Sequence, residues 1–240
     1  MTRALHRRCK GFTLTELAVV MVIVAVLMGG LLIPLSAQRD AQAYRETQIQ
    51  LDEIREALIG FAVTNGRLPR PATSINNGLE NPTPCTMTSC QGYIPWATLG
   101  IRKTDAWGKM IHYSVTPAFA NTSFGLSTIG RKKIESRDST GNEIYLVGSA
   151  SLCAADSPCA PAVVYSFGKH NWGTSSEGAA LTDASTTNVD EDTNNAAGDI
   201  YFVRDQTDNA SATGGEFDDL VVWISPYILF NRMIAAGKLP

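Results

Sequence analysis

The feature that most constrains the fold of this chain is an apolar run near its N-terminus. The run extends from Gly11 to Leu35, and from Leu17 to Leu35 it contains no charged residue. Because a helix of roughly 20 apolar residues crosses the ~30 Å hydrocarbon core of a bilayer, we predict a transmembrane helix over 12–35. A basic leader without acidic residues, 1–11, precedes it.

One ionisable residue, Glu16, lies just inside the apolar run. A lone carboxylate in a membrane helix costs on the order of 3 kcal/mol, so it suggests a functional role. A secretory signal peptide is one alternative, but it needs small residues for cleavage after the run, where 36–38 (Ser-Ala-Gln) are a weak candidate. An ordinary signal anchor is the other, and it leaves Gly11, Phe12 and Glu16 unexplained.

Residues 11–16 read GFTLTE and follow a short basic leader that ends in Gly. This segment resembles the class III leader and mature start of type IV pilins and type II secretion pseudopilins. The resemblance implies that a prepilin peptidase cleaves between Gly11 and Phe12 and methylates the new amine of Phe12. It also implies that Glu16 pairs with that amine on a neighbouring subunit during assembly, where opposite charges offset the cost of burying each other.

The same resemblance implies a location and partners. The protein would be a single-pass inner-membrane protein with its leader in the cytoplasm and its head in the periplasm, and then part of an extracellular pilus or a periplasmic pseudopilus. Its partners would be other pilin or pseudopilin subunits, the prepilin peptidase and the inner-membrane assembly platform. The large head favours a minor pilin or minor pseudopilin, and whether the machine is a pilus or a secretion system stays open.

Helical spacing of apolar and small residues continues over 36–65, with charges on the other face. Asn65-Gly66 is a typical helix stop, and Pro34 predicts a kink because it removes one backbone hydrogen bond. We therefore expect an amphipathic second helix half over 36–65, followed by a β-rich head over 66–240. The apolar or small positions are Ala37, Ala41, Tyr44, Leu51, Ile54, Leu58, Phe61 and Ala62.

The head contains short strand patterns separated by turn-forming residues, which favour an antiparallel sheet over βαβ units. A strand is expected to follow 105–108, a mobile surface loop is expected over 174–195, and a short helix over 227–236 follows an N-cap at Ser225. The fold class is thus α+β and similar to pilins: a long N-terminal helix on an antiparallel sheet, with a short C-terminal helix. Further strands are predicted at 124–129, 143–147, 162–167, 200–203 and 220–224.

The number and spacing of the cysteines bear on two alternatives, disulfides and a zinc site. Cys9 lies in the leader, and the other four form two close pairs, Cys85 with Cys90 and Cys153 with Cys159. In an exported chain an even number favours disulfides, and two local loops are the simplest of the three connectivities. The alternative is a four-thiolate zinc site, although these spacings are looser than the usual C-x2-C pairs.

Two further features of the head follow the resemblance. Asp105, Trp107 and Gly108 match the pseudopilin D-x-W-G signature, for which we expect a packing role. Major pseudopilins hold calcium late in the head, and here Asp218 and Asp219 are the best carboxylates, while His170 stands where the first loop would carry an Asp. Calcium is the candidate cofactor, and solvated acids on a loop are the alternative.

The sequence offers little support for other classes of function. It lacks H-E-x-x-H, G-x-S-x-G, Walker A and G-x-G-x-x-G motifs, so we expect no enzyme and no catalytic residues. A net charge of −3 does not favour nucleic acid as a partner, and the basic run 131–133 is expected to be a solvated face. Two hypotheses remain: a structural filament subunit, or a membrane-anchored domain that binds calcium, a secreted substrate, DNA or a surface ligand without polymerising.

Overall fold

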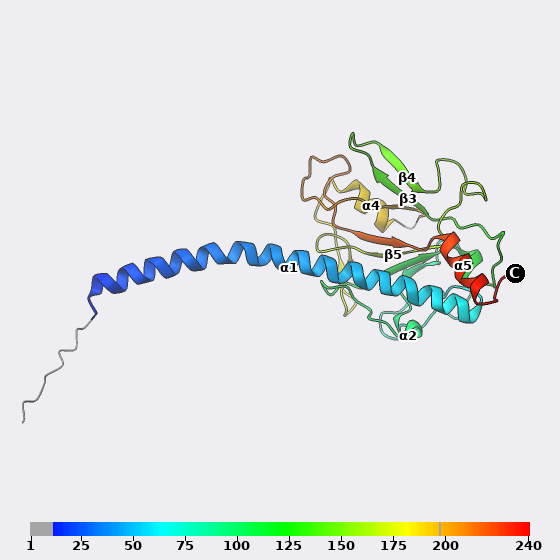
Figure 1. Cartoon of the computed structure of the whole chain (residues 1–240), viewed down its shortest axis with the longest axis horizontal. Helices are drawn as coiled ribbons and strands as arrows, with labels where there is room; N and C mark the ends of the chain where they lie inside the picture. The colour runs from blue at the N-terminus through cyan, green and yellow to red at the C-terminus, as the bar shows by residue number, and fades with distance from the viewer. Residues whose placement is uncertain (1–11, 197) are drawn as a thin grey trace, which may run out of the picture. The chain divides into compact units, whose positions relative to one another are not determined.

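The computed structural model describes residues 12–196 and 198–240, and for residues 28–35 it describes only the helical backbone. The chain divides into two compact units, residues 1–43 and residues 44–240, and helix α1 (Leu14–Asn65) has residues in both (Figure 1). All other elements belong to the second unit. They are β1 (Gln91–Tyr93), α2 (Trp96–Leu99), β2 (His112–Val115), α3 (Pro117–Ala120), β3 (Lys133–Arg137), β4 (Glu143–Val147), β5 (Ala162–Ser166), β6 (Gly173–Thr174), β7 (Ala180–Leu181), α4 (Val189–Asn195), β8 (Ile200–Phe202), β9 (Leu220–Trp223) and α5 (Pro226–Ala235).

The start of α1, in the first unit, is apolar and exposed. From Leu14 to Leu27 its described side chains are all exposed, and Val22 retains 63% of its accessible surface. The helix is continuous through Pro34, whose side chain is outside the described residues, so the kink there stays a prediction. Among the described residues no helix is long and apolar enough to span a membrane, and residues 28–35 of the expected span are outside the side chains described.

The part of α1 in the second unit buries one face. Leu51, Ile54, Leu58 and Ala62 are almost fully buried and recur every three or four residues, as expected for an amphipathic helix. The helix ends as predicted, because Gly66 adopts a positive φ of 73° and its N–H donates to the carbonyl of Ala62 at 2.7 Å. This face of α1 is what the head packs against.

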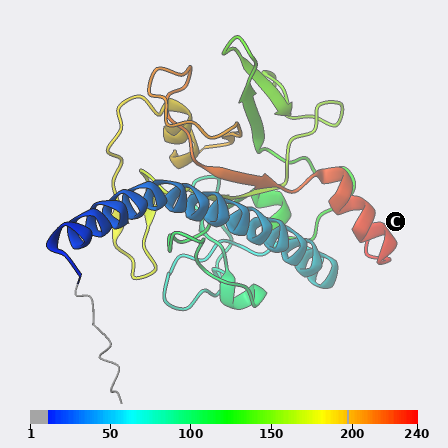
Figure 2. The same ribbon diagram turned by 60° about the vertical axis from the view of Figure 1, so that its left-hand side comes forward.

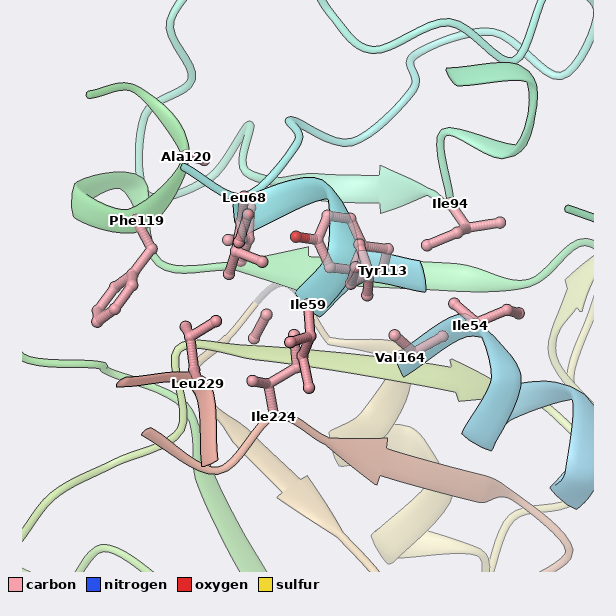
Figure 3. Close-up of a cluster of buried hydrophobic side chains, with 14 of the residues drawn as sticks. Ile54, Ile59, Leu68, Ile94, Tyr113, Phe119, Ala120, Val164, Ile224 and Leu229 are labelled. Carbon is pink, nitrogen blue, oxygen red and sulfur yellow. The ribbon is translucent and has the colours of Figure 1, made fainter. Parts of the chain in front are cut away.

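The main sheet has the order β1-β2-β5-β9, and all its pairs are antiparallel. Strand β5 is buried along its whole length because both faces of the sheet are covered. Its side chains alternate: Ala162 and Val164 join the core that contains α1, whereas Val163 and Tyr165 join a second cluster with Ile134 and Tyr201. Figure 3 shows the first core, in which side chains from α1, β2, β5 and α5 meet.

A second sheet, with the order β4-β3-β8, contains one parallel pair, β3 with β8. The predicted antiparallel sheet is confirmed by the main sheet, and the β3–β8 pair is an exception to it. Strand β3 itself was not predicted, because its basic and acidic residues hide any apolar alternation. The basic run 131–133 is also not a fully solvated face: Lys132 is only 2% exposed, and its Nζ lies 2.7 Å from Asp199 Oδ1.

Two more expectations about the head are wrong. Residues 124–129 form a turn-containing loop instead of a strand, although Phe124 is buried in the main core. The segment 174–195, expected to be a mobile surface loop, contains the β6–β7 hairpin and α4. Polar composition misled the prediction here, since α4 buries polar side chains whose partners lie elsewhere in the fold. The segment that leads into β9 lies beside α4 and supplies one of these partners, the N–H of Asp218 (Figure 2).

The C-terminal helix agrees closely with its prediction. It occupies Pro226–Ala235, with Ser225 at the N-cap position and Pro226 at the first turn. The Ser225 side chain makes no capping hydrogen bond among the described residues, so proline geometry and packing hold the helix start. Leu229 and Met233 bury the inner face against the core that contains α1.

Candidate functional site

The start of α1 is a reciprocal hydrogen-bonded cap formed by Thr13 and Glu16. The N–H of Glu16 donates to Thr13 Oγ1 at 3.3 Å, and Glu16 Oε2 accepts from the N–H and the hydroxyl of Thr13, each at 2.9 Å. This is a capping box, in which a Thr and a Glu three residues later satisfy two otherwise unpaired N–H groups. The T-x-x-E spacing by itself predicts this capping box, but the interpretation of Glu16 as an assembly residue did not make use of it.

The residues around the expected cleavage bond are exposed. Phe12 retains 83% of its accessible surface, and Glu16 is exposed on the first turn of α1. Gly11 is outside the described residues, so the cleavage and methylation assignments to Gly11 and Phe12 stay predictions. An open apolar hollow of about 330 Å³ lies beside Glu16 and is lined by Phe12, Thr15, Val19 and Val20.

In the head, the D-x-W-G signature forms a tight turn organised by Asp105. Asp105 Oδ1 accepts hydrogen bonds from the backbone N–H groups of Trp107 at 3.0 Å and Lys109 at 2.9 Å, and Gly108 has a φ of +82°. Asp105 Oδ2 accepts a 2.6 Å hydrogen bond from the hydroxyl of Ser166 at the end of β5. Trp107 is half-buried against the main core. The signature therefore joins the turn to β5.

Lys109, which directly follows the signature, points into the loop after β5. Its side chain is buried, with only 4% of the residue exposed. Its Nζ donates to four backbone carbonyl oxygens of this loop: Phe167 at 3.0 Å, His170 at 2.6 Å, Asn171 at 3.3 Å and Trp172 at 2.9 Å. Burial lowers the pKa of Lys109, and the surrounding acids act in the opposite direction.

Three buried carboxylates lie next to this loop. Oxygens of Glu191, Asp218 and Asp219 lie within 4.8 Å of one another. Burial, with a smaller contribution from the charge of Glu191, raises the pKa of Asp218 to about 7 and raises that of Asp219 well above its usual range. A cavity of about 410 Å³, lined by His170, Glu191, Asp218 and others, opens in front of them.

Hydrogen bonds already occupy most of these oxygens. Asp218 Oδ2 accepts from the N–H groups of Lys169 at 3.0 Å and His170 at 2.8 Å, and Glu191 Oε1 accepts from the N–H of Asp218 at 2.7 Å. Within the part of the chain that the structure describes, Asp218 Oδ1 is buried without a hydrogen-bond partner. The remaining bonds reach Glu191 Oε2 from the side chains of Asn171 and Asn188, and Asp219 Oδ2 from the side chain of Asn194.

The arrangement fits a calcium ion poorly. Calcium takes six to eight oxygen ligands, which in loops include backbone carbonyls. The carbonyls that could complete such a shell here surround the ammonium of Lys109. His170, expected in the place of a ligand Asp, has an exposed side chain and contributes its backbone. Calcium at Asp218 and Asp219 therefore stays a prediction, and the sequence reasoning missed Lys109 and the grouping with Glu191.

The cysteines agree with the local pairing. Disulfides join Cys85 to Cys90 and Cys153 to Cys159, so these four cysteines are not thiolate ligands for zinc. One late acid, Asp190, is part of a buried ion-pair cluster. Asp190 is fully buried and lies 2.6 Å from Arg137 and 2.9 Å from Arg204.

Comparison with known protein families matches residues 6–32 to the prokaryotic N-terminal methylation motif. No curated protein and no solved structure matches the chain. The matched segment contains the GFTLTE residues and most of the apolar run, and it implies a membrane-anchored N-terminal segment. This motif, on an α+β fold consistent with that of pilins, supports a type IV pilin-like or pseudopilin precursor.

Proposed function

We propose that this protein is a filament subunit that assembles through the first part of α1. The observation that supports the proposal most directly is the exposed apolar surface of α1 from Leu14 to Leu27, with a single acid, Glu16, at its start. Contiguous apolar surface of this kind marks contact with lipid or with other proteins. Packing such helices side by side, first in the inner membrane and then in a filament core, would bury it.

Processing would prepare the segment for assembly. A prepilin peptidase would cleave the Gly11–Phe12 bond at the cytoplasmic face and methylate the amine of Phe12, and the assembly platform would then extract the subunit into a pilus or a periplasmic pseudopilus. Because Glu16 lies one helical turn from Phe12, its carboxylate can reach an amine that approaches this end of α1 from a neighbouring subunit. The pairing would set the axial register, since an unpaired charge in the filament core is costly.

Mass spectrometry of the mature protein tests the processing step. We expect Phe12 as the first residue, carrying one methyl group on its amine. A mature chain that retains Met1, or one that begins near Ala37, would contradict the proposal and favour an ordinary anchor or signal peptide.

A pair of variants separates the capping role that the structure gives Glu16 from the assembly role proposed for it. Glu16→Gln keeps an acceptor for the capping box, because Gln also serves at this position, but removes the charge. Thr13→Ala weakens the cap and leaves the charge in place. We expect Glu16→Gln to abolish most filament production and co-purification with other pilins, with membrane insertion unchanged, and Thr13→Ala to reduce them only slightly.

The reverse result, a strong defect for Thr13→Ala and none for Glu16→Gln, would limit Glu16 to capping the helix. It would favour the second candidate function, a membrane-anchored binding domain that does not polymerise. One observation supports that alternative: a cavity of about 650 Å³ is lined by residues of 116–118 and 129–133, together with Met87 and Cys153 from the two disulfide-containing loops. Its ligand would be a secreted substrate, DNA, a surface molecule or, at the acid cluster, calcium.

A further inference from the structure

The loop between β5 and β6, residues 167–172, is built around a positive charge that comes from the chain itself. Four of its carbonyl oxygens lie 2.6–3.3 Å from Lys109 Nζ. An ammonium group has three N–H donors, so at least one of them is shared between two of these oxygens. Carbonyl oxygens that converge in this way create negative potential, which a cation at their centre stabilises.

The position of Lys109 is held from both ends. Its own N–H donates to Asp105 Oδ1 at 2.9 Å, and Asp105 Oδ2 is held by Ser166, the residue directly before the loop. Gly173 at the end of the loop leaves only enough room for the lysine stem, since a Cβ there would lie 3.1 Å from Lys109 Cδ. The signature turn and the loop therefore place the ammonium in a built site.

The buried acids complete the environment of this cation. Asp218, Asp219, Glu191 and Asp105 all favour the charged form of Lys109 electrostatically. Asp218 also holds the outer side of the loop, where it accepts the N–H groups of Lys169 and His170. Gly168 lets the loop approach Asp218 closely, because a Cβ at this position would lie 2.2 Å from the Asp218 carbonyl oxygen. Carbonyls and carboxylates thus surround one internal cation.

We infer that the ammonium of Lys109 is the resident cation of this loop, in the place where the family resemblance would put a calcium ion. The loop carbonyls that could complete a calcium shell already accept hydrogen bonds from Lys109, so the loop and the acid cluster beside it fold without a divalent ion. The inference does not depend on filament assembly, and it predicts that the head keeps its structure when calcium is removed.

The first test uses the full chain in detergent micelles, with calcium as the probe. We expect the same melting temperature in excess EDTA and in millimolar calcium chloride, and no calcium-binding heat by titration calorimetry. A melting temperature that falls in EDTA and recovers with calcium, and that loses this response in Asp218→Asn, would overturn the inference and establish the calcium site.

The second test removes the ammonium. Lys109→Met keeps the length of the side chain and deletes its donors, so the four carbonyls lose their partner. We expect the melting temperature to fall by about 5 °C or more, and amide hydrogen exchange in residues 167–172 to become about tenfold faster or more, because loss of local contacts favours local opening.

Lys103→Met is the matched control, since Lys103 is half-buried and its Nζ donates to a single carbonyl, that of Ser176, at 3.0 Å. We expect a change of about 2 °C or less for this variant and unchanged exchange in the loop. Equal effects of the two variants, or unchanged exchange in Lys109→Met, would overturn the inference. If Lys109→Met does not fold, the calcium test on the wild-type chain still decides the question.

Discussion

The two units of this protein distribute apolar and charged residues in opposite ways. In the first unit, aliphatic side chains of α1 such as Val22 are exposed, and no other part of the described chain covers them. In the second unit, charged side chains such as Lys109, Asp190 and Lys132 are buried and apolar residues form two ordinary cores. Each of these three buried charges thus has a partner within the head, whereas the exposed part of α1 lacks a covering surface among the described residues.

This difference shows which interactions each unit needs from outside. Burying apolar surface contributes about 25 cal/mol per Å², and this gain is absent for α1 until lipid or other helices cover it. Buried charges, by contrast, are tolerated only where a partner is already in place. We therefore expect changes in the first unit to affect insertion and assembly, and changes in the second unit to affect folding.

The largest effect should come from a charge in the exposed part of α1. Val22→Lys would put an ammonium where the resemblance predicts a bilayer or filament core, at a cost of about 3 kcal/mol near a helix centre. We expect loss of most filament production and reduced recovery in the membrane fraction.

Ile49→Lys is the matched control for Val22→Lys. Ile49 lies on the same helix within the second unit, and it is 61% exposed, against 63% for Val22. We expect it to behave like the wild type. If the two variants behave alike, the proposal that the two parts of α1 differ in their role is wrong.

A large effect on folding should follow from breaking a buried ion pair. Asp190→Asn would leave Arg137 and Arg204 without their buried partner, a change that typically costs about 3–5 kcal/mol. Urea unfolding of the full chain in detergent measures this loss. Asp52→Asn, whose pair with Arg55 is partly exposed, is the control and should change stability by less than about 1 kcal/mol. A small loss for Asp190→Asn would mean that water replaces the carboxylate.

A pH-dependent effect should come from His112, whose ring packs among the rings of Tyr93, Tyr165 and Phe167. Burial lowers its pKa from 6.5 to about 4. Between these two values the unfolded chain takes up a proton that the folded chain excludes, so this contribution to stability falls as the pH drops from 6.5 towards 4. The loss should reach at most about 3 kcal/mol.

His112→Gln tests the pH effect, because Gln does not titrate. As the pH falls from 6.5 towards 4, the free energy of unfolding of the wild type should decrease relative to that of this variant. Measuring the difference is necessary because the raised pKa of Asp218 acts in the opposite direction over part of the same range. A difference that does not vary with pH would show that water reaches the His112 ring.

The smallest effect should come from an exposed ion pair. Arg102 and Glu46 lie 3.0 Å apart, but both side chains are largely exposed. Arg102→Ala should therefore change the free energy of unfolding by less than about 1 kcal/mol, and less at high salt. A larger loss, measured by urea unfolding, would show that the position of α1 on the head depends on this contact.

Local patterns predicted several parts of this molecule well. The GFTLTE segment, the helix stop at Gly66, the strands at β4, β5, β8 and β9 and the two disulfides depend on residues that are close in the sequence. Strand β5 was predicted from its apolar run alone, although the reason for its complete burial, covering on both faces, appears only in the fold.

The predictions failed where charged or polar residues are buried. Lys132 was expected in solvent, and 174–195 was expected to be a mobile loop, because composition gives no information about distant partners. Lys132 depends on Asp199, which lies in a different part of the chain. Similarly, the buried residues of α4 depend on partners that the fold brings to them, such as Arg137 for Asp190.

The sequence by itself determined the N-terminal motif, the long apolar helix, the α+β class and the local disulfides, because periodicity, spacing and proximity act within a short stretch of chain. Only the tertiary structure decided that Lys109 enters the loop after β5 and that Glu191 joins Asp218 and Asp219. Those contacts join segments 58–63 and 27 residues apart along the chain. Buried charge depends on partners in three dimensions, so packing selects which polar residues become part of the interior.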